Sequence, residues 1–319
     1  MSKYSCEPID LSGLHTIPIH ARGGKVRVEH FAKTYSGGGV VGLLDSLPHI
    51  LAADSFRAVL DRVMEARARK KMILWGLGGH VVKCGLAPVL IDLMSRGYVT
   101  AFALNGAAAI HDFEIAIAGQ TSEDVEAVLP DGRFGAAEET GREMNAALNR
   151  EDVPQPEGFG EALGRHLENV ADARYAGCSL LCRAYRSATP VTVHVAVGTD
   201  TPHTHPSAQG AAIGRATHYD FRLLCSLVKG MSDGGVYLNV GSAVVLPEVF
   251  LKAVSVVRNL GHPLANFTTV NFDFLQHYRP RVNVVERPHA RAGGQGYSIT
   301  GHHEIMIPLL AAALIEREP

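Results

Sequence analysis

The chain has 319 residues, of which 19% are charged, and its formal net charge at pH 7 is −2. This length and this low share of charge favour a compact, enzyme-like fold and exclude a disordered chain. No long run of Lys or Arg occurs, and no apolar run reaches the ~18 residues of a membrane span, so neither nucleic acid nor a membrane is an expected partner.

Helical and strand patterns alternate along most of the chain. Residues 1–40 are irregular, and we expect residues 41–319 to form a single α/β domain. Helical patterns cover 54–69, 80–97, 105–119, 121–129, 133–150, 176–185, 217–231, 247–261 and 302–318. Strand patterns cover 71–76, 99–105, 191–198, 266–274 and 297–301, while 235–246 reads as a strand followed by a turn. Two segments, 151–158 and 276–295, are expected to be irregular loops.

Capping residues sharpen some of these boundaries. Asp54 is a candidate N-cap for the first helix, and Thr121 or Ser122 for the helix over 121–129. Pro247 begins another predicted helix. The strands are almost uniformly apolar, which is typical of a parallel sheet covered on both faces. We therefore predict a doubly wound, mainly parallel, Rossmann-like α/β fold with five or six strands.

Ligands of such sheets bind beyond the carboxyl ends of the strands. Most polar, chemically competent residues of this chain lie in the segments that directly follow strands. These segments are 76–83, 105–114, 198–210, 241–247 and 273–277. We expect an active site for a small-molecule substrate along this one edge of the sheet.

The first of these segments, WGLGGHVVKCG, contains Gly76, Gly78 and Gly79 between a strand and a helix. Glycines at such a turn let backbone N–H groups approach a phosphate. The pattern is GxGG and matches neither GxGxxG nor the Walker motif. A tight strand-to-helix turn explains it equally well, and His80 and Lys83 are either ligand contacts or helix-surface residues.

A second segment, LNGAAAIHDFE, contains Asn105, His111, Asp112 and Glu114. The three ionisable residues fall within about one helical turn. Asp112 is placed to orient His111 as an acid or base, and the carboxylates are suited to a cationic ligand. An ordinary polar helix face is the alternative interpretation.

The His-rich stretch between residues 194 and 218 offers the metal-binding alternative. His194, His203, His205 and His218 supply imidazoles of the kind that zinc prefers. The chain has no HExxH or CxxC motif, so we favour a site without a metal and keep this set for a metal-dependent hydrolase. The last loop adds Gln276, His277 and Glu286, and no GxSxG elbow points to a serine hydrolase.

The five cysteines do not change this interpretation. Their odd number and the lack of a signal peptide lead us to expect free thiols in a reducing cytoplasm. Cys178 and Cys182 stand four residues apart in a helical pattern. Without a second pair, buried helix cysteines are the favoured interpretation over a zinc site.

Four segments together resemble the deoxyhypusine synthase family, over about residues 40–317. They are ILWGLGGHVVKCGLAP, PVTVHVAVGTD, VYLNVGSAVVLP and YSITGHHEIMIPLLAAAL. The resemblance implies a Rossmann-like fold, a homotetramer with active sites at subunit interfaces, and NAD-dependent oxidation of spermidine. By position it implies cofactor contacts at Gly78, Gly79, Asp200, Ser242 and Asp273.

The chain differs from that family at the residues that carry out the family's reaction. The family's catalytic lysine precedes the last helix, whereas the last lysine here is Lys252, and the only tryptophan is Trp75. Arginine, always protonated, does not replace an imine-forming lysine. We therefore expect NAD-dependent chemistry on a polyamine or another small amine, but not deoxyhypusine synthesis.

Roles within this chemistry follow from residue type. We expect His203, His205 or His111 to act as base. Substrate contacts are predicted at Asn105, Asp112, Glu114 and His277. The NAD-dependent enzyme is the first hypothesis and the metal-dependent hydrolase is the second. The third is a homologue that binds a ligand without catalysing a reaction.

Overall fold

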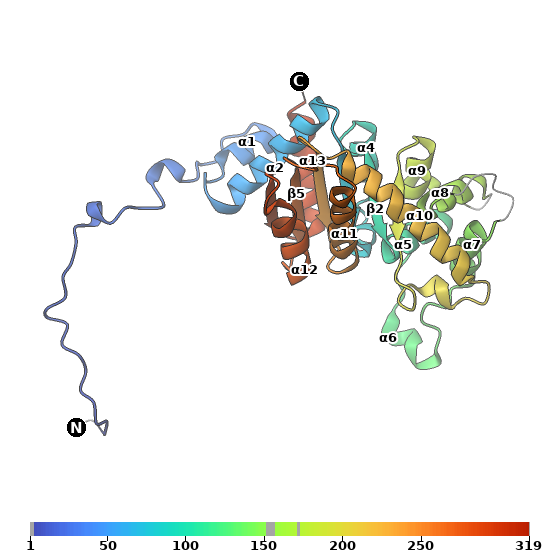
Figure 1. Cartoon of the computed structure of the whole chain (residues 1–319), viewed down its shortest axis with the longest axis horizontal. Helices are drawn as coiled ribbons and strands as arrows, with labels where there is room; N and C mark the ends of the chain where they lie inside the picture. The colour runs from blue at the N-terminus through green and yellow to red at the C-terminus, as the bar shows by residue number, and fades with distance from the viewer. Residues whose placement is uncertain (1–2, 151–156, 171–172, 319) are drawn as a thin grey trace.

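The computed structural model describes residues 3–150, 157–170 and 173–318. Six strands form one sheet in which every neighbouring pair is parallel, in the order β3-β2-β1-β4-β5-β6 (Figure 1). The strands are β1 (Ile73–Leu77), β2 (Ala101–Asn105), β3 (Val191–His194), β4 (Val236–Val240), β5 (Thr268–Asp273) and β6 (Gln295–Thr300). The predicted doubly wound, Rossmann-like α/β fold is confirmed, and each predicted strand is present.

The strand order fixes where a ligand can enter. From β1 the chain first adds β2 and β3 on one side and then β4, β5 and β6 on the other. Leu74, the second residue of β1, pairs with Ala101 of β2 and with Tyr237 of β4. This order is that of dinucleotide-binding sheets, whose crevice opens where the direction of winding reverses. Here that point lies between the carboxyl ends of β1 and β4.

Helices cover both faces of the sheet, as Figure 1 shows. They are α1 (Gly39–Ser46), α2 (Leu51–Ala68), α3 (Gly79–Lys83), α4 (Ala87–Ser95), α5 (Gly106–Ala118), α6 (Val125–Val128), α7 (Glu138–Leu148), α8 (Phe159–Asn169), α9 (Leu180–Arg186), α10 (Gly210–Lys229), α11 (Val245–Asn259), α12 (Tyr278–Pro280) and α13 (His303–Glu316). Trp75 of β1 packs in the core cluster that α2, α4, α5, α9 and α13 complete, whereas Leu74 packs in a second cluster beneath α11 and the end of α10. Adjacent strand residues thus serve opposite faces, so both faces are apolar.

Several element boundaries differ from the sequence-based prediction. The helix predicted over 80–97 breaks into α3 and α4 at Gly85, whose φ of 74° no regular helix allows. The N-cap of α6 is Asp124, which accepts a hydrogen bond from the Ala127 N–H, so the prediction of Thr121 or Ser122 is wrong. Helix α10 starts at Gly210, seven residues before the predicted boundary, and α8 was missed.

The segment predicted as an irregular loop over 276–295 holds short helical turns. These are α12, a π-helical turn η6 (Arg281–Glu286) and a 3-10 turn η7 (Arg287–His289). Of the loop predicted over 151–158, residues 151–156 lie outside the described residues. Cys182 is buried in α9 as expected, but Cys178 is exposed in a 3-10 turn η4 (Ala176–Cys178).

The N-terminal segment before α1 runs away from the rest of the molecule (Figure 1). Its regular elements within residues 3–38 are two 3-10 turns, η1 (Ile19–Ala21) and η2 (Val28–His30). The division of the chain near residue 40 stays a prediction. No helix among the described residues combines the length and the apolar character needed to cross a membrane.

Two buried carboxylates hold backbone segments in place. Asp112 on α5 accepts hydrogen bonds from the Ser179 hydroxyl and from the N–H groups of Leu180 and Leu181, at 2.6 to 2.9 Å. Asp220 on α10 accepts from the N–H groups of Val193 and Gly160, at 2.7 and 3.0 Å. Each side chain is fully buried. Asp112 therefore caps α9, and its position points to a structural role in place of the predicted substrate contact.

The Asp220→Asn exchange tests the cost of burying this charge. Burial raises the pKa of Asp220 from 3.8 to about 7, although three backbone hydrogen bonds oppose the shift. The folded chain therefore binds the proton more tightly than the unfolded chain, and this group's contribution to stability falls as pH rises from about 4 to 7. Asp220→Asn has no carboxyl group at this position to titrate. Between pH 4 and pH 7, the free energy of unfolding of the unaltered chain should therefore fall by on the order of 3 kcal/mol relative to that of the variant.

Urea unfolding at pH 4.5 and pH 8 measures this difference. Asp45→Asn, on the exposed side of α1, is the matched control for the loss of one carboxylate. A gap between Asp220→Asn and the unaltered chain that stays constant with pH would contradict the prediction. Titration of the shared groups, including His194, cancels in the comparison.

Candidate functional site

The turns after β1 and β4 meet at the point where the winding of the sheet reverses. The Gly78 N–H donates to the Val240 carbonyl at 2.9 Å. A Cβ on Gly78 would lie 2.0 Å from the carbonyl oxygen of Gly241, so only glycine allows this approach. Gly79 begins α3, where N–H groups have no preceding turn to accept them. The glycines thus shape the base of the crevice.

His111 on α5 lies directly beside this glycine turn. Its Cδ2 is 3.2 Å from the position of a Cβ on Gly79, and its Nδ1 is 2.7 Å from the Thr121 hydroxyl. Thr121 donates its proton to Glu114 in a short hydrogen bond. The hydroxyl oxygen is then free to accept from Nδ1–H, which leaves Nε2 of His111 with its lone pair. The arrangement suits a general base.

An acidic cavity of about 650 Å³ opens next to this relay. Its carboxylates are Glu114, Glu123, Glu139 and Glu143. Arg142 also lines it, but its guanidinium pairs with Glu138 and Glu143. Burial acts to raise the pKa of Glu114, yet hydrogen bonds from His111, Thr121 and Thr140 outweigh it and hold the pKa below its usual value. An ionised Glu114 at the cavity wall favours a cationic ligand.

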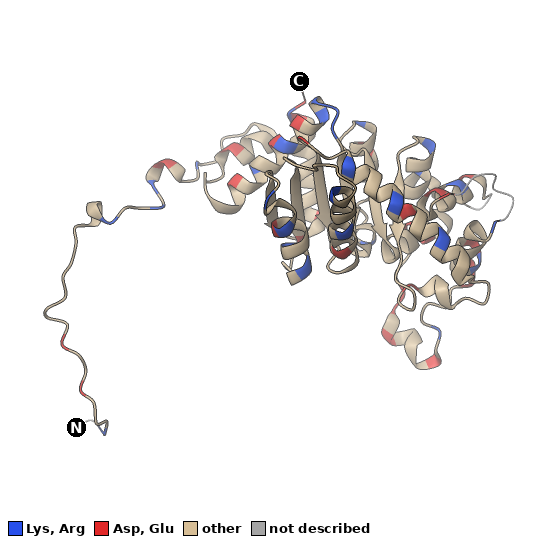
Figure 2. Ribbon diagram, in the orientation of Figure 1, with Lys and Arg blue, Asp and Glu red and all other residues tan. Residues whose placement is uncertain are grey.

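Charged residues of both signs are mixed over the face that Figure 2 shows. Figure 2 shows Lys and Arg interspersed with Asp and Glu along the visible helices. Such exposed, mixed charge contributes mainly to solubility. The acidic cavity differs because Glu114 is half-buried and hydrogen-bonded.

The four histidines of the predicted metal set, all in the described part of the chain, contact different residues and do not contact one another. His194 is buried on β3, 3.0 Å from the Thr192 hydroxyl, and burial lowers its pKa to about 3, so the ring is neutral. His205 contacts Ser207 and Glu138 at the start of α7. His218 is exposed on α10. Among the described residues, these side chains do not form a group that could share one ion.

His203 and Asp200 instead form a partly buried pair at the end of β2. One Asp200 oxygen accepts from the Ala196 N–H at 2.8 Å and lies 2.0 Å from a Cβ position on Gly106. Burial raises the pKa of Asp200 and lowers that of His203. Nδ1 of His203 is buried with no hydrogen-bond partner among the described residues. The pair is packed beneath the first turn of α5.

The other residues predicted to contact a ligand differ in solvent exposure and in the hydrogen bonds that their side chains already make. Asn105 accepts from the Ala108 N–H and caps α5, and Ser242 accepts from the Leu246 N–H near the start of α11. Both oxygens are thus engaged in the fold. Asp273 at the end of β5 is buried, 3.9 Å from Nε2 of His303, and His277 is exposed.

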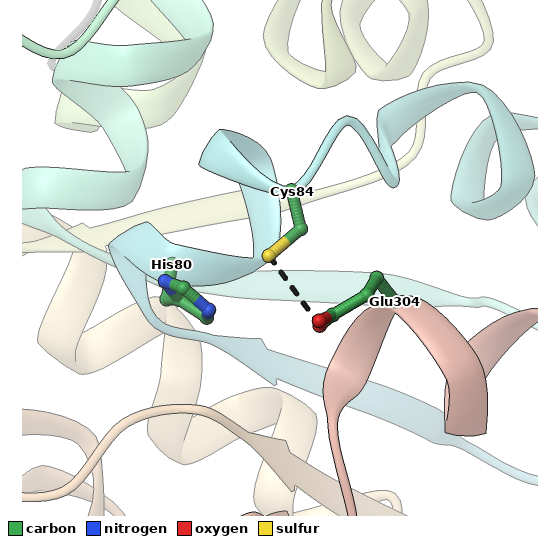
Figure 3. Close-up of side chains that lie close together, drawn as sticks. All are labelled: His80, Cys84 and Glu304. Carbon is green, nitrogen blue, oxygen red and sulfur yellow. Dashed lines mark hydrogen bonds between the residues drawn. The ribbon is translucent and has the colours of Figure 1, made fainter.

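One cluster at this edge was not predicted. His80 and Cys84 project from α3 toward Glu304 of α13, and their ligand atoms all lie within 4.8 Å of one another (Figure 3). Of the residues the structure describes, no other group of three or more His, Cys, Asp or Glu side chains meets this distance. Burial, followed by the charge of Glu304, raises the pKa of the Cys84 thiol, which opposes a role as a thiolate nucleophile.

Comparison with known proteins identifies the fold but no family. No protein-family model and no curated protein matches the chain. The unliganded structure of AgrE matches with a TM-score of 0.53 and 16% identity over 84% of this chain and 34% of that one. AgrE has also been captured with ornithine and NAD+, and that complex matches with a TM-score of 0.50 at 14% identity, over 84% of this chain and 34% of that one.

Two further solved structures share the fold. A protein from Methanococcus maripaludis S2, assigned to the LOR/SDH group, matches with a TM-score of 0.51 and 14% identity over 83% of this chain and 70% of that one. A protein from Entamoeba histolytica, assigned as a deoxyhypusine synthase, matches with a TM-score of 0.50 and 11% identity over 87% and 93%. The chain spans about a third of the length of AgrE. At these identities the likeness shows the fold alone.

Proposed function

We propose that this chain is an NAD-dependent enzyme that oxidises a small amine-containing substrate. The observation that carries the proposal is the position of His111. It lies between the glycine turn at the crevice, where a Rossmann-like sheet holds a dinucleotide, and a cavity lined by four carboxylates. The complex of AgrE with ornithine and NAD+ supports the pairing of this fold with such ligands.

The residues at the crevice fit a dinucleotide. Gly78 and Gly79 offer a turn on which side chains would block close approach. Asp200 lies against Gly106 at the end of β2, the place from which folds of this kind hold a ribose hydroxyl. Asp273 lies beyond the switch point at the end of β5. We assign these four residues to the cofactor, Asp200 and Asp273 by their positions near strand ends although both side chains are buried in the free chain. The Ser242 hydroxyl is already engaged by the Leu246 N–H.

The remaining residues act on the substrate. Glu114 and its neighbours in the cavity bind the ammonium group, and Nε2 of His111 removes a proton from the substrate nitrogen. A bound NAD+ would supply the hydride acceptor for the carbon next to that nitrogen. Thr121 and Glu114 stabilise the imidazolium that forms. The other predicted bases fit less well, because His205 is held by Ser207 and Glu138 and His203 is packed under α5.

The parent activity of the resembling family is not part of the proposal. Lys252 pairs with Glu248 at 2.8 Å on the exposed side of α11, and no lysine follows it in the sequence. The chain therefore has no lysine at the position before the last helix where the resembling family carries its imine-forming lysine. We further propose a homo-oligomer, because exposed apolar side chains of the N-terminal segment, such as Ile9, Leu14 and Val28, suit burial against a second copy.

Thermal unfolding of the tag-free chain with and without NAD tests the proposal. NAD at 100 times its Kd should stabilise the fold by about 2.7 kcal/mol and raise Tm. NADP serves as the comparison, and formation of NADH with ornithine or spermidine then tests the chemistry. If neither dinucleotide changes Tm, the cofactor proposal is wrong, and the chain is a ligand-binding homologue of these enzymes.

A further inference from the structure

The single turn formed by α3 and its C-cap residue Cys84 presents two metal-binding atoms side by side. The Cys84 N–H donates to the His80 carbonyl at 2.9 Å and closes one helical turn. Residues four apart on a helix lie on the same face, the spacing by which zinc-binding helices present two ligands. His80 and Cys84 therefore project to one side of α3, as Figure 3 shows.

The third ligand comes from the other end of the chain. Glu304 in the first turn of α13 brings its Oε2 to 3.7 Å from Sγ of Cys84. In a tetrahedral site with the usual Zn–S and Zn–O bond lengths, these two atoms stand roughly 3.6 Å apart. The thiol and the carboxylate are thus already spaced like two corners of a zinc tetrahedron. His80 is exposed, so its side chain has solvent-facing room in which to reorient.

We propose that His80, Cys84 and Glu304 form a Zn²⁺ site with a fourth position open to solvent. The mixed set of nitrogen, sulfur and oxygen suits zinc and argues against Mg²⁺ or Ca²⁺, which take oxygen ligands. Three protein ligands with one open position is the pattern of zinc sites that bind a water or a substrate atom. The site does not rest on NAD binding.

A buried histidine with one unpartnered ring nitrogen packs beside the cluster. His303 is 1% exposed, its ring centroid lies 5.6 Å from that of His80, and its Nδ1 has no hydrogen-bond partner among the described residues. A buried polar nitrogen without a partner costs free energy. The ring that carries this nitrogen packs edge-on against His80 of the proposed site.

Charges on the packed elements are mixed around the cluster. Lys83 lies on α3, and His302 on α13 stands 3.8 Å from Glu304 while its ring stacks on Phe274. The thiol donates its hydrogen bond to Glu304. Binding of Zn²⁺ replaces the thiol proton, which is released to water, so the affinity should rise with pH.

Titration of the chelator-treated, tag-free full chain with Co²⁺ and then with Zn²⁺ tests the site. We expect one Co²⁺ per chain, with a sulfur-to-cobalt charge-transfer band and the visible bands of a tetrahedral ion, and displacement of Co²⁺ by Zn²⁺. Cys84→Ser should remove the charge-transfer band. Glu304→Gln should weaken Zn²⁺ binding by roughly 100-fold, since it removes a ligand rather than an outer partner.

Control variants separate this site from general binding and from misfolding. Cys178→Ser removes an exposed thiol and His262→Ala a histidine at the end of α11, and both should bind Co²⁺ like the unaltered chain. Circular dichroism checks the fold of every variant. Co²⁺ binding without the sulfur band, or one ion retained by both Cys84→Ser and Glu304→Gln, would overturn the proposal. A melting shift with NAD in metal-free protein reports the proposed function separately.

Discussion

Replacing His111 by glutamine should lower the rate of NAD reduction with an amine by about 10²- to 10⁴-fold, the range expected for loss of a general base. Glutamine preserves hydrogen bonding to Thr121 but has no lone pair suited to accept the proton. The NAD-dependent change in Tm should be the same in His111→Gln as in the unaltered chain, so the loss falls on turnover and not on cofactor binding. A purely structural role of His111 would not produce this separation.

His205→Gln is the matched control for this experiment. His205 also contacts a hydroxyl and a carboxylate, those of Ser207 and Glu138, but it lies at the start of α7 and away from the glycine turn. Its replacement should leave turnover close to that of the unaltered chain. If His205→Gln loses activity and His111→Gln keeps it, the base has been assigned to the wrong histidine.

Gly78→Ala should destabilise the fold and abolish dinucleotide binding together. The backbone at Gly78 is extended, with φ of −84°, so alanine meets no conformational barrier. Its Cβ, however, would lie 2.0 Å from the Gly241 oxygen and 2.9 Å from the Ser242 nitrogen, which are backbone atoms that cannot turn away. The turns after β1 and β4 must separate, and overpacking of this kind costs about 3 kcal/mol.

Urea unfolding and the NAD-dependent change in Tm measure the two effects. Gly214→Ala, on the exposed side of α10, meets nothing within 4 Å and is the control. It should stabilise the chain by about 0.4 to 1 kcal/mol, because alanine restricts the unfolded chain. A Gly78→Ala variant as stable as the unaltered chain would mean that the turns are not packed as described.

Runs of apolar residues were sufficient to predict the strands that are buried on both faces. Strands such as β1 and β4 are buried on both faces, so their sequences are nearly uniform in apolar residues and stand out from the helices. Helix ends were harder to predict. The break at Gly85 and the cap at Asp124 depend on local dihedral angles and side-chain hydrogen bonds, which a periodicity does not contain.

The candidate site combines residues that the sequence suggested with others that it did not. The glycine turn and His111 were predicted because they follow strands. The partner of His111, Thr121, was read as a helix cap, and the cavity beside it contains Glu139 and Glu143 from α7, which follows no strand. Asp112 was predicted to bind substrate because its neighbours in sequence are polar, yet the packing of α9 buries it.

Local sequence determined the parallel sheet, its alternation with helices and the edge at which polar residues gather, since these depend on contacts within about one element. Only the tertiary structure decided which polar residues meet. Glu304 lies 220 residues from Cys84 in the sequence, and no spacing rule connects them. They come together because α3 and α13 both begin at the carboxyl edge of one parallel sheet, which places chain segments of any separation side by side.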